Sequence, residues 1–394
     1  MLLQEVMNSH GDNVDTLIYP ICFNMRHSIE LRLKGAIEEI IRISKLKGGN
    51  LEFDLSGSHD IGNIWEFFQH ESVRLDRRFS NINYELNQTI IDISNIDATG
   101  QTFRYPIDTE SKKHLVDIGG IISCRILLIK FTELEKNLDT LHYFTNYLAE
   151  EYRYDTYTNN LSRADIFEIA TQLPKRSEWA TDKFTDIKTN IRSQYKISSN
   201  EFCKACNLIQ NNYETAYFIK VDLSLLGLCE TQILEFLDFW VKLNPTFRDR
   251  SIQNFCVTSI DFSFIDEIIE RDKIKKETID ALDNSLTPEY LAGLNAIFYF
   301  ARELDFSESY KFIYETELKG AKFHSENKKE ISRNFLHIFS KCNFIDNLLK
   351  SLYFLNFIDL AEKIVQLYDL EDVIKCLETL RSSSAFIKPD ICGY

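Results

Sequence analysis

One stretch near the start of the chain reads NMRHSIELRLK over residues 24–34. Its charged residues Arg26, Glu30 and Lys34 are four residues apart, so a helix carries them on one side. Nearly the same side continues with apolar residues, namely Leu33, Ile37 and Ile41. Charged groups placed against an apolar core are unfavourable unless they are paired. The row is therefore either a structural ion-pair network or part of a functional site, and the sequence leaves both interpretations open.

The composition of the whole chain is typical of a helical protein. Of its 394 residues 44% are hydrophobic, whereas only 13 are Gly and 6 are Pro. Folds built from β-strands need many turn residues, so this scarcity predicts an all-α fold. Apolar periodicity predicts helices over 18–47, from Ile61 onward, over 79–93 and over 110–153. Ser58 is the expected N-cap of the helix that starts at Ile61.

A polar run at residues 153–162 interrupts this periodicity and marks the expected domain boundary. Residues 1–155 are predicted to form one helical bundle. Residues 160–394 are predicted to form a larger helical domain of stacked helical hairpins, with a subdivision near residue 285 left open.

The net charge of −15 opposes non-specific binding of nucleic acids or membranes by the surface as a whole. One basic stretch stands out, because residues 26–47 contain six Lys or Arg and only three Asp or Glu. No secretory signal and no long apolar run is visible, so the expectation is a cytoplasmic protein with no membrane segment. Motifs for phosphate loops, dinucleotides and zinc are absent, so the sequence predicts no cofactor and no metal.

Two further motifs follow the charged row. His59 and Asp60 precede Trp65 at the start of a predicted helix, and Trp65 is expected in the core. A polar loop over residues 95–108 then contains Phe103-Arg104-Tyr105-Pro106 and ends at Asp108. Arg104 and Tyr105 would present a second basic group from a loop.

The succession RHxIELxLK, HDxxxxW and FRYPxD, followed by a long helix, resembles a pattern in HEPN-type helical proteins of prokaryotes. The resemblance covers about residues 15–153. It implies a helical bundle and a setting in toxin–antitoxin, abortive-infection or other antiviral systems. Many HEPN proteins are metal-independent ribonucleases and dimers, so the resemblance also implies RNA as a ligand and a homodimer.

The chain departs from the HEPN ribonucleases at their signature, an Arg followed by four to six residues and then a His. That spacing lets a guanidinium stabilise phosphate charge while an imidazole transfers a proton. None of the eight His residues follows an Arg at this distance. The nearest approach is Arg333 to His337, one residue short, and these two are candidates for phosphate binding.

Two functional hypotheses follow from the sequence. In the first, the protein binds or cleaves RNA, with Arg26, His27 and Arg104 as catalytic candidates. The binding candidates of this hypothesis are Glu30, Lys34, His59, Tyr105, Arg333 and His337. In the second, the protein is a non-catalytic sensor or scaffold that assembles with a partner effector or antitoxin protein. The acidic composition and the missing Arg–His spacing favour this second hypothesis.

Overall fold

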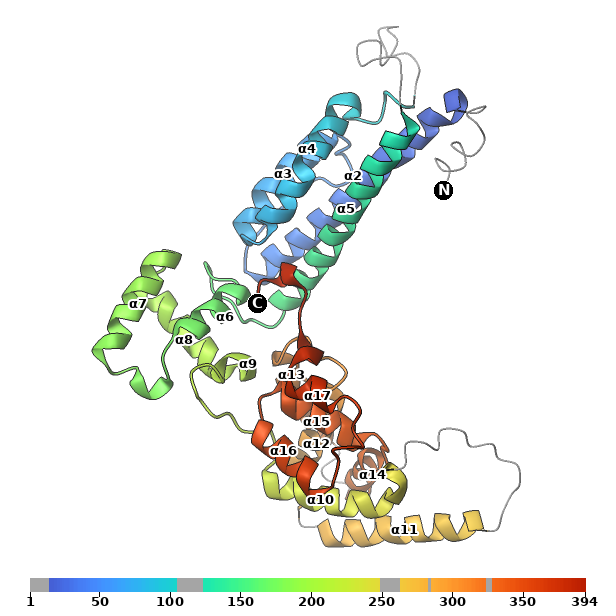
Figure 1. Ribbon diagram of the computed structural model, residues 1–394, viewed down its shortest axis with the longest axis vertical. Helices are drawn as coiled ribbons and strands as arrows, with labels where there is room; N and C mark the ends of the chain where they lie inside the picture. The colour runs from blue at the N-terminus through green and yellow to red at the C-terminus, as the bar shows by residue number, and fades with distance from the viewer. Residues whose placement is uncertain (1–13, 105–122, 249–262, 283–284, 324–327) are drawn as a thin grey trace. The chain divides into compact units, whose positions relative to one another are not determined.

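The fold is seen in a computed structural model (Figure 1). The structure describes residues 14–104, 123–248, 263–282, 285–323 and 328–394. Within these ranges all regular secondary structure is helical, which confirms the predicted all-α class. No helix in the described ranges combines the length and the apolar character needed to cross a membrane.

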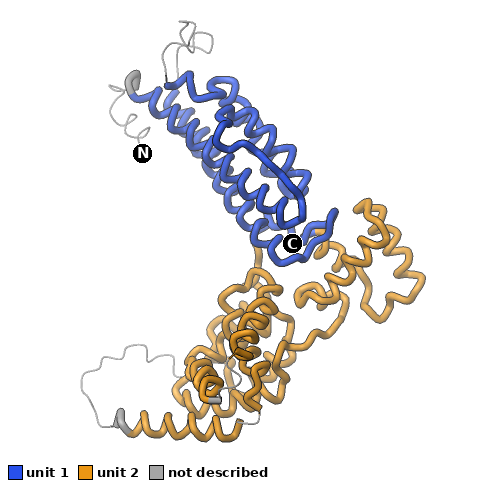
Figure 2. Tube along the Cα trace, turned by 180° about the vertical axis from the view of Figure 1, so that it is seen from behind, with its two compact units in different colours: residues 1–164, 389–394 blue, residues 165–388 orange. Residues whose placement is uncertain are grey.

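The chain divides into two compact units (Figure 2). The first unit comprises residues 1–164 together with the six residues 389–394, and the second comprises residues 165–388. The sequence places the division between residues 155 and 160, whereas the observed units divide at 164 and again at 388. The second unit is therefore inserted between two segments of the first, a topology that no local sequence pattern indicates.

The first unit is a bundle of four helices. They are α2 (Val14–Leu46), α3 (Ile61–Leu75), α4 (Phe79–Asp97) and α5 (Cys124–Tyr152). Ion pairs join α2 to α5 at Arg32–Asp139 and at Arg42–Glu150, so these two helices run parallel. The predicted helix over 110–153 thus begins at Cys124, where Ser123 is its N-cap, and residues 105–122 lie outside the described ranges.

The apolar seam that follows the charged row lies in the core of this bundle. Leu33 and Ile37 are fully buried, and Ile41 packs against the core from its edge. Trp65 of α3 is buried as predicted, and its indole N–H donates to the side chain of Asn87 at 3.0 Å. Burying one such aliphatic side chain contributes about 1.5–3 kcal/mol, so the seam fixes which face of α2 points inward.

A non-helical segment, residues 47–60, returns the chain from the end of α2 to the level of Arg26. Gly48 begins this return with φ +75°, a conformation that favours glycine after a helix end. The segment is held to the bundle by buried Leu51 and by Phe53, whose ring lies 4.5 Å from that of Phe67. Because of this return, α3 starts beside the charged row.

The N-cap of α3 is Asp60 and not Ser58, so that prediction was wrong. The Asp60 carboxylate accepts the backbone N–H of Asn63 at 3.0 Å. Ser58 lies before the cap and lines a pocket instead. Asp60 is the better cap because an ionised carboxylate interacts more favourably with a helix N-terminus than a hydroxyl does.

The second unit is helical throughout its described residues. Its elements are α6 (Arg163–Gln172, which begins in the first unit), α7 (Asp182–Tyr195), α8 (Ser199–Asn211), α9 (Tyr213–Ala216), α10 (Glu230–Leu243), α11 (Ser263–Leu282), α12 (Pro288–Phe300), α13 (Glu308–Phe323), α14 (Lys328–Phe339), α15 (Phe344–Phe354), α16 (Ile358–Leu367) and α17 (Leu377–Arg381). Helix α12 packs against α13, α14 and α15, and consecutive helices α15 and α16 pack against each other. The apolar core of this unit gathers around α12 and α15.

Candidate functional site

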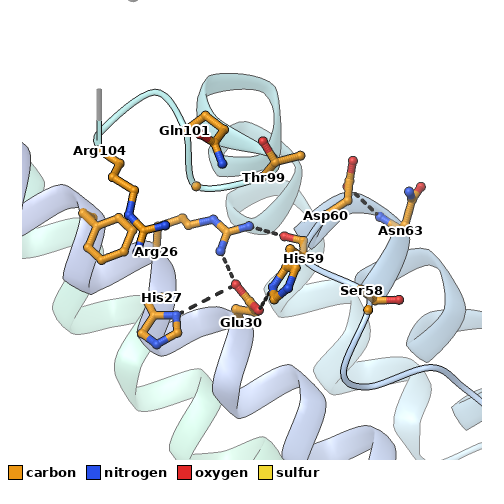
Figure 3. A pocket seen from close by; sticks show the side chains of 13 residues that line it. Arg26, His27, Glu30, Ser58, His59, Asp60, Asn63, Thr99, Gln101 and Arg104 are labelled. Atoms are coloured by element: carbon orange, nitrogen blue, oxygen red, sulfur yellow. Dashed lines mark hydrogen bonds and ion pairs between the residues drawn. The ribbon is translucent and has the colours of Figure 1, made fainter. Parts of the chain in front are cut away.

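Three segments of the first unit meet around a pocket of about 720 Å³ (Figure 3). They are the first half of α2, the segment that leads into α3, and the loop that follows α4. The lining residues are Phe23, Arg26, His27, Glu30, Gly57, Ser58, His59, Asp60, Asn63, Thr99, Gly100, Gln101 and Arg104. Two members of the charged row, Arg26 and Glu30, therefore line one wall of this pocket.

Arg26 joins the three segments. Its Nε donates to the backbone carbonyl of Asp97 at 3.3 Å, and its Nη2 donates to the carbonyls of His59 and Ala98. Carbonyls at a helix C-terminus lack intrahelical donors, so the guanidinium closes the end of α4. Nη1 is directed at Glu30, which leaves the buried Arg26 with four protein acceptors.

The carboxylate of Glu30 is the centre of the site. It pairs with Arg26 and with Lys34, whose Nζ lies 2.9 Å from Oε1. Nδ1 of His59 lies 3.0 Å from Oε1, and Nδ1 of His27 lies 3.9 Å from Oε2. Burial works against the charged carboxylate, but hydrogen bonds from Lys34, His59 and Arg26 outweigh it and lower the pKa of Glu30 to about 2. Glu30 is therefore an anion at neutral pH.

The loop after α4 is shaped around Arg26. The buried Asp97 carboxylate accepts the backbone N–H groups of Thr102 at 3.1 Å and Phe103 at 3.4 Å. Gly100 has φ +81°, and a Cβ atom there would lie 3.4 Å from Nη1 of Arg26. A larger residue at position 100 would therefore be strained in backbone conformation and crowded against the guanidinium.

This loop places Arg104 at the rim of the pocket. The guanidinium carbon of Arg104 lies 5.2 Å from the centre of the Phe23 ring. The same ring is nearly parallel to the imidazole of His27, with 5.9 Å between the centroids. A cation, a phenyl ring and an imidazole thus lie side by side along one wall.

The exposed groups of this site have the chemistry of an anion-binding and proton-transfer site. The side chains of His27 and His59 are 48% and 62% exposed, and both face the same carboxylate. Arg104 adds a cation that a phosphate could approach. Ser58, Asn63 and Gln101 add neutral hydrogen-bonding groups.

The structure brings several sequence candidates of the first unit together, and two other candidates belong to the second unit. Arg26, His27, Glu30, His59 and Arg104 line the pocket, and Lys34 reaches it through Glu30. Tyr105 lies outside the described residues. Arg333 and His337 belong to α14 in the second unit, where Arg333 is exposed and its Nη1 lies 4.0 Å from Glu330.

Several contributors were not singled out from the sequence, among them Phe23, Asp97 and Gly100. Asp97 and Gly100 carry a local signal, because an Asp three residues before a Gly is typical of a loop that folds around its own backbone N–H groups. Within the described ranges no group of three His, Cys, Asp or Glu is placed to hold a metal ion.

Comparison of the chain with protein-family models, curated proteins and solved structures returned no match.

Proposed function

We propose that the first unit is a HEPN-like bundle that binds and cleaves RNA at the Glu30 pocket without a metal ion. By the resemblance of its sequence motifs, its setting is a bacterial antiphage defence or toxin system. One observation carries the proposal. Two exposed imidazoles, His27 and His59, face a single ionised carboxylate in a pocket that also contains Arg104.

The proposed chemistry needs two proton-transfer groups and one cation. One imidazole accepts the proton of a ribose 2′-hydroxyl as that oxygen attacks the adjacent phosphorus. The second imidazole donates a proton to the departing 5′-oxygen, which leaves a 2′,3′-cyclic phosphate and a 5′-hydroxyl. Arg104 stabilises the negative charge that develops on the phosphoryl oxygens.

Arg26 has a different role in this proposal from the phosphate contact that the sequence analysis assigns to it. Its guanidinium donates to the carbonyls of Asp97, His59 and Ala98 and to the carboxylate of Glu30. A group with so many protein acceptors has little capacity left for a phosphate. Arg26 is accordingly a positioning residue, and Arg104 supplies the cation that contacts RNA.

The test is cleavage of a labelled RNA oligonucleotide by purified protein in the presence of EDTA. We expect His59→Ala to lower the rate at least 100-fold, since positioned acid–base groups contribute about 10²–10⁴-fold. His70→Ala is the matched control, because His70 is also exposed and also pairs with a glutamate, Glu71, but lies outside the pocket. Equal rates for the two variants, or an uncleaved RNA with the wild type, would refute the proposal.

A second candidate is the non-catalytic sensor or scaffold that assembles with a partner effector. The full engagement of Arg26 by protein acceptors favours it, because the residue then serves only the fold. Induced expression in bacteria separates the two. Toxicity with degraded RNA from the wild type but not from His27→Ala/His59→Ala, which changes only exposed side chains, supports the ribonuclease, whereas intact RNA from both and a captured partner protein support the scaffold.

A further inference from the structure

A second concentration of positive charge lies in the second unit, over residues 174–220. This segment contains eight Lys or Arg and five Asp or Glu, a net charge of +3 in a chain of net charge −15. It comprises a short 3₁₀ turn (Arg176–Glu178), α7, α8, α9 and the turn that follows α9. The eight cations are spread over a segment of 47 residues that contains three helices, so no short run of the sequence shows this excess.

The cations of this lobe lack carboxylate partners. None of its eight Lys and Arg side chains forms an ion pair with a carboxylate of the described ranges; the lobe's Glu214 pairs instead with Lys388. Elsewhere arginines such as Arg74 and Arg381 are matched by one or more carboxylates. Because cations outnumber carboxylates in this lobe, its net charge of +3 attracts a polyanion, and side chains without an ion-pair partner are available to bind one.

Aromatic rings alternate with these cations. Arg176 lies over the ring of Trp179 at 4.7 Å, and Trp179 is stacked on Phe184 with 5.1 Å between the centroids. From Phe184 a row of residues at four-residue spacing continues along α7 to its C-cap, namely Lys188, Arg192 and Lys196. Residues at this spacing share one side of a helix, so the row extends the stack by about 12 Å of positive surface.

The turn after α9 adds two exposed rings beside the stack. The backbone N–H of Arg176 donates to the carbonyl of Ile219 at 2.8 Å, which fixes the turn next to the stack. Tyr217 and Phe218 are 44% and 43% exposed, and Nζ of Lys220 lies 4.1 Å from the centre of the Tyr217 ring. Exposed rings flanked by cations are platforms on which bases stack.

We propose that this lobe, residues 174–220, is a second binding surface, for single-stranded nucleic acid. The row of Lys188, Arg192 and Lys196 contacts successive phosphates, and the rings of Tyr217 and Phe218 stack on bases. A single strand is the fitting partner because only unpaired bases expose their faces to aromatic side chains. The inference does not depend on the Glu30 pocket and stands or falls separately from it.

Binding of a fluorescein-labelled 12-nucleotide oligo(U) to the full chain, followed by fluorescence anisotropy at low salt, tests the proposal. Its riboses carry 2′-O-methyl groups, so the chemistry proposed for the pocket cannot cleave it. We expect Lys188→Gln/Lys196→Gln to weaken binding at least tenfold. The slope of log K against log salt should become shallower by about 0.7 for each phosphate that the variant no longer neutralises. The matched control is Lys273→Gln/Lys276→Gln on α11, which changes the net charge equally and should alter binding less than twofold.

Two further measurements keep the outcome decisive. Tyr217→Ala/Phe218→Ala removes only exposed rings, so the variant should fold normally. We expect its affinity for oligo(U) to be at least tenfold lower than that of the wild type. Tryptophan fluorescence reports the same event locally, because Trp65 and Trp240 are buried and Trp179 is the partly exposed one of the three. We expect oligo(U) to change the fluorescence of the wild type and not that of Trp179→Phe.

A third variant, His59→Ala/Arg104→Ala, distinguishes oligo(U) binding at the pocket from oligo(U) binding at the lobe. If this variant still binds oligo(U) and the α7 variant does not, the lobe is the binding surface. If the pocket variant fails to bind and the α7 variant still binds, the inference is wrong while the proposed function stands. Absence of oligo(U) binding by the wild type at 100 µM protein overturns the inference as well.

Discussion

The first unit contains two arginine-centred networks, at Arg26 and at Arg78, and their charges are balanced in opposite ways. At the first, the cations of Arg26 and Lys34 surround the single carboxylate of Glu30. At the second, the guanidinium of Arg78 lies between two buried carboxylates, Asp76 and Glu151. The first network therefore places cations around one carboxylate, whereas the second places one guanidinium between two carboxylates.

The surroundings of the two networks differ as well. The Arg78 side chain is 9% exposed and also donates to the carbonyl of Cys392 at 2.8 Å. The hydroxyl of Tyr152 donates to Asp76 at 2.9 Å, and that of Tyr394 donates to Glu151 at 2.8 Å. Each charged group there is covered by protein. Around Glu30, by contrast, two half-exposed imidazoles face a pocket.

The differences between the two networks distinguish a structural ion network from a candidate site, although both contain buried charge. Burial and pairing are common to both networks. What differs is access from a pocket and the presence of exposed titratable groups that the fold does not require. By these two criteria the Arg26 network is the candidate site and the Arg78 network is structural.

The largest effect on stability is expected from Arg78→Met. Burial works against the charged guanidinium, but Glu151 and Asp76 outweigh it and raise the pKa of Arg78 above its ordinary value. Removing this partner leaves two buried carboxylates uncompensated, which costs about 3–5 kcal/mol. Hydrogen exchange of α5 amides measures the loss, and Arg74→Met, at an exposed pair, should cost less than about 1 kcal/mol. Equal effects would show that the Arg78 network is not structural.

The spacing of charged residues in the sequence predicted part of the Arg26 network. Residues four apart on a helix share a side, so Arg26, Glu30 and Lys34 were expected together, and in the structure both cations bind the one carboxylate. The acceptors of Arg26 beyond Glu30 include backbone carbonyls of Asp97 and Ala98, more than 70 residues away. Backbone carbonyls are the same at every position, so no side-chain pattern could indicate this contact.

Contacts between distant segments were equally inaccessible from sequence. Arg78 reaches Cys392, 314 residues further along the chain, because the last six residues return to the first unit. The basic lobe over residues 174–220 was missed for a related reason. Its cations alternate with carboxylates in the sequence, and only the folded lobe shows that those carboxylates do not pair with them.

Glu30→Gln is expected to have the next largest effect. A neutral amide cannot balance Arg26, which is buried with its remaining donors committed to carbonyls. We expect a loss of about 3 kcal/mol in the stability of the first unit. Glu150→Gln is the control, since Glu150 pairs with Arg42 and Arg153 at the surface and should contribute about 0–1 kcal/mol. A loss no greater than that of the control would mean that Glu30 is not needed for the fold.

The acid sensitivity of the bundle gives a second measure of Glu30. Its pKa is lowered from 4.5 to about 2, so its stabilising effect is complete above pH 4.5 and is lost as the pH falls toward 2. This shift corresponds to at most roughly 3 kcal/mol, and water in the open pocket screens part of it. Asp76 also has a lowered pKa, despite burial, because of Arg78, so Glu30→Gln should reduce the acid sensitivity without abolishing it. Unfolding curves from pH 6 to pH 2 that coincide in slope for wild type and variant would contradict the assignment.

Arg104→Ala should change ligand binding at the pocket and leave the stability of the bundle nearly unchanged. Arg104 is exposed and its described contact is with the Phe23 ring, so its loss should change the stability of the bundle by less than about 0.5 kcal/mol. Loss of one charge-assisted hydrogen bond to a phosphate costs about 1.5–3 kcal/mol, so RNA affinity at the pocket should fall about 10–100-fold. The test is the anisotropy of a labelled RNA, measured in the Lys188→Gln/Lys196→Gln background. The control is Arg125→Ala, which replaces an exposed arginine of α5. An equal loss of RNA affinity in both variants would show that Arg104 has no specific role in binding.

Tyr394→Phe should have the smallest effect on stability. It measures how much the Tyr394 hydroxyl contributes to the Arg78 network. The Tyr394 hydroxyl lies 2.8 Å from both the Glu151 carboxylate and the Tyr147 hydroxyl. Burial, followed by the charge of Glu151, raises the pKa of Tyr394 above its ordinary value, so the hydroxyl remains a donor at all ordinary pH values. Its removal still leaves Arg78 on Glu151, and we expect a loss of about 1 kcal/mol in hydrogen exchange of α5 amides. A loss as large as that of Arg78→Met would show instead that the six residues 389–394, and not the guanidinium, close this end of the bundle.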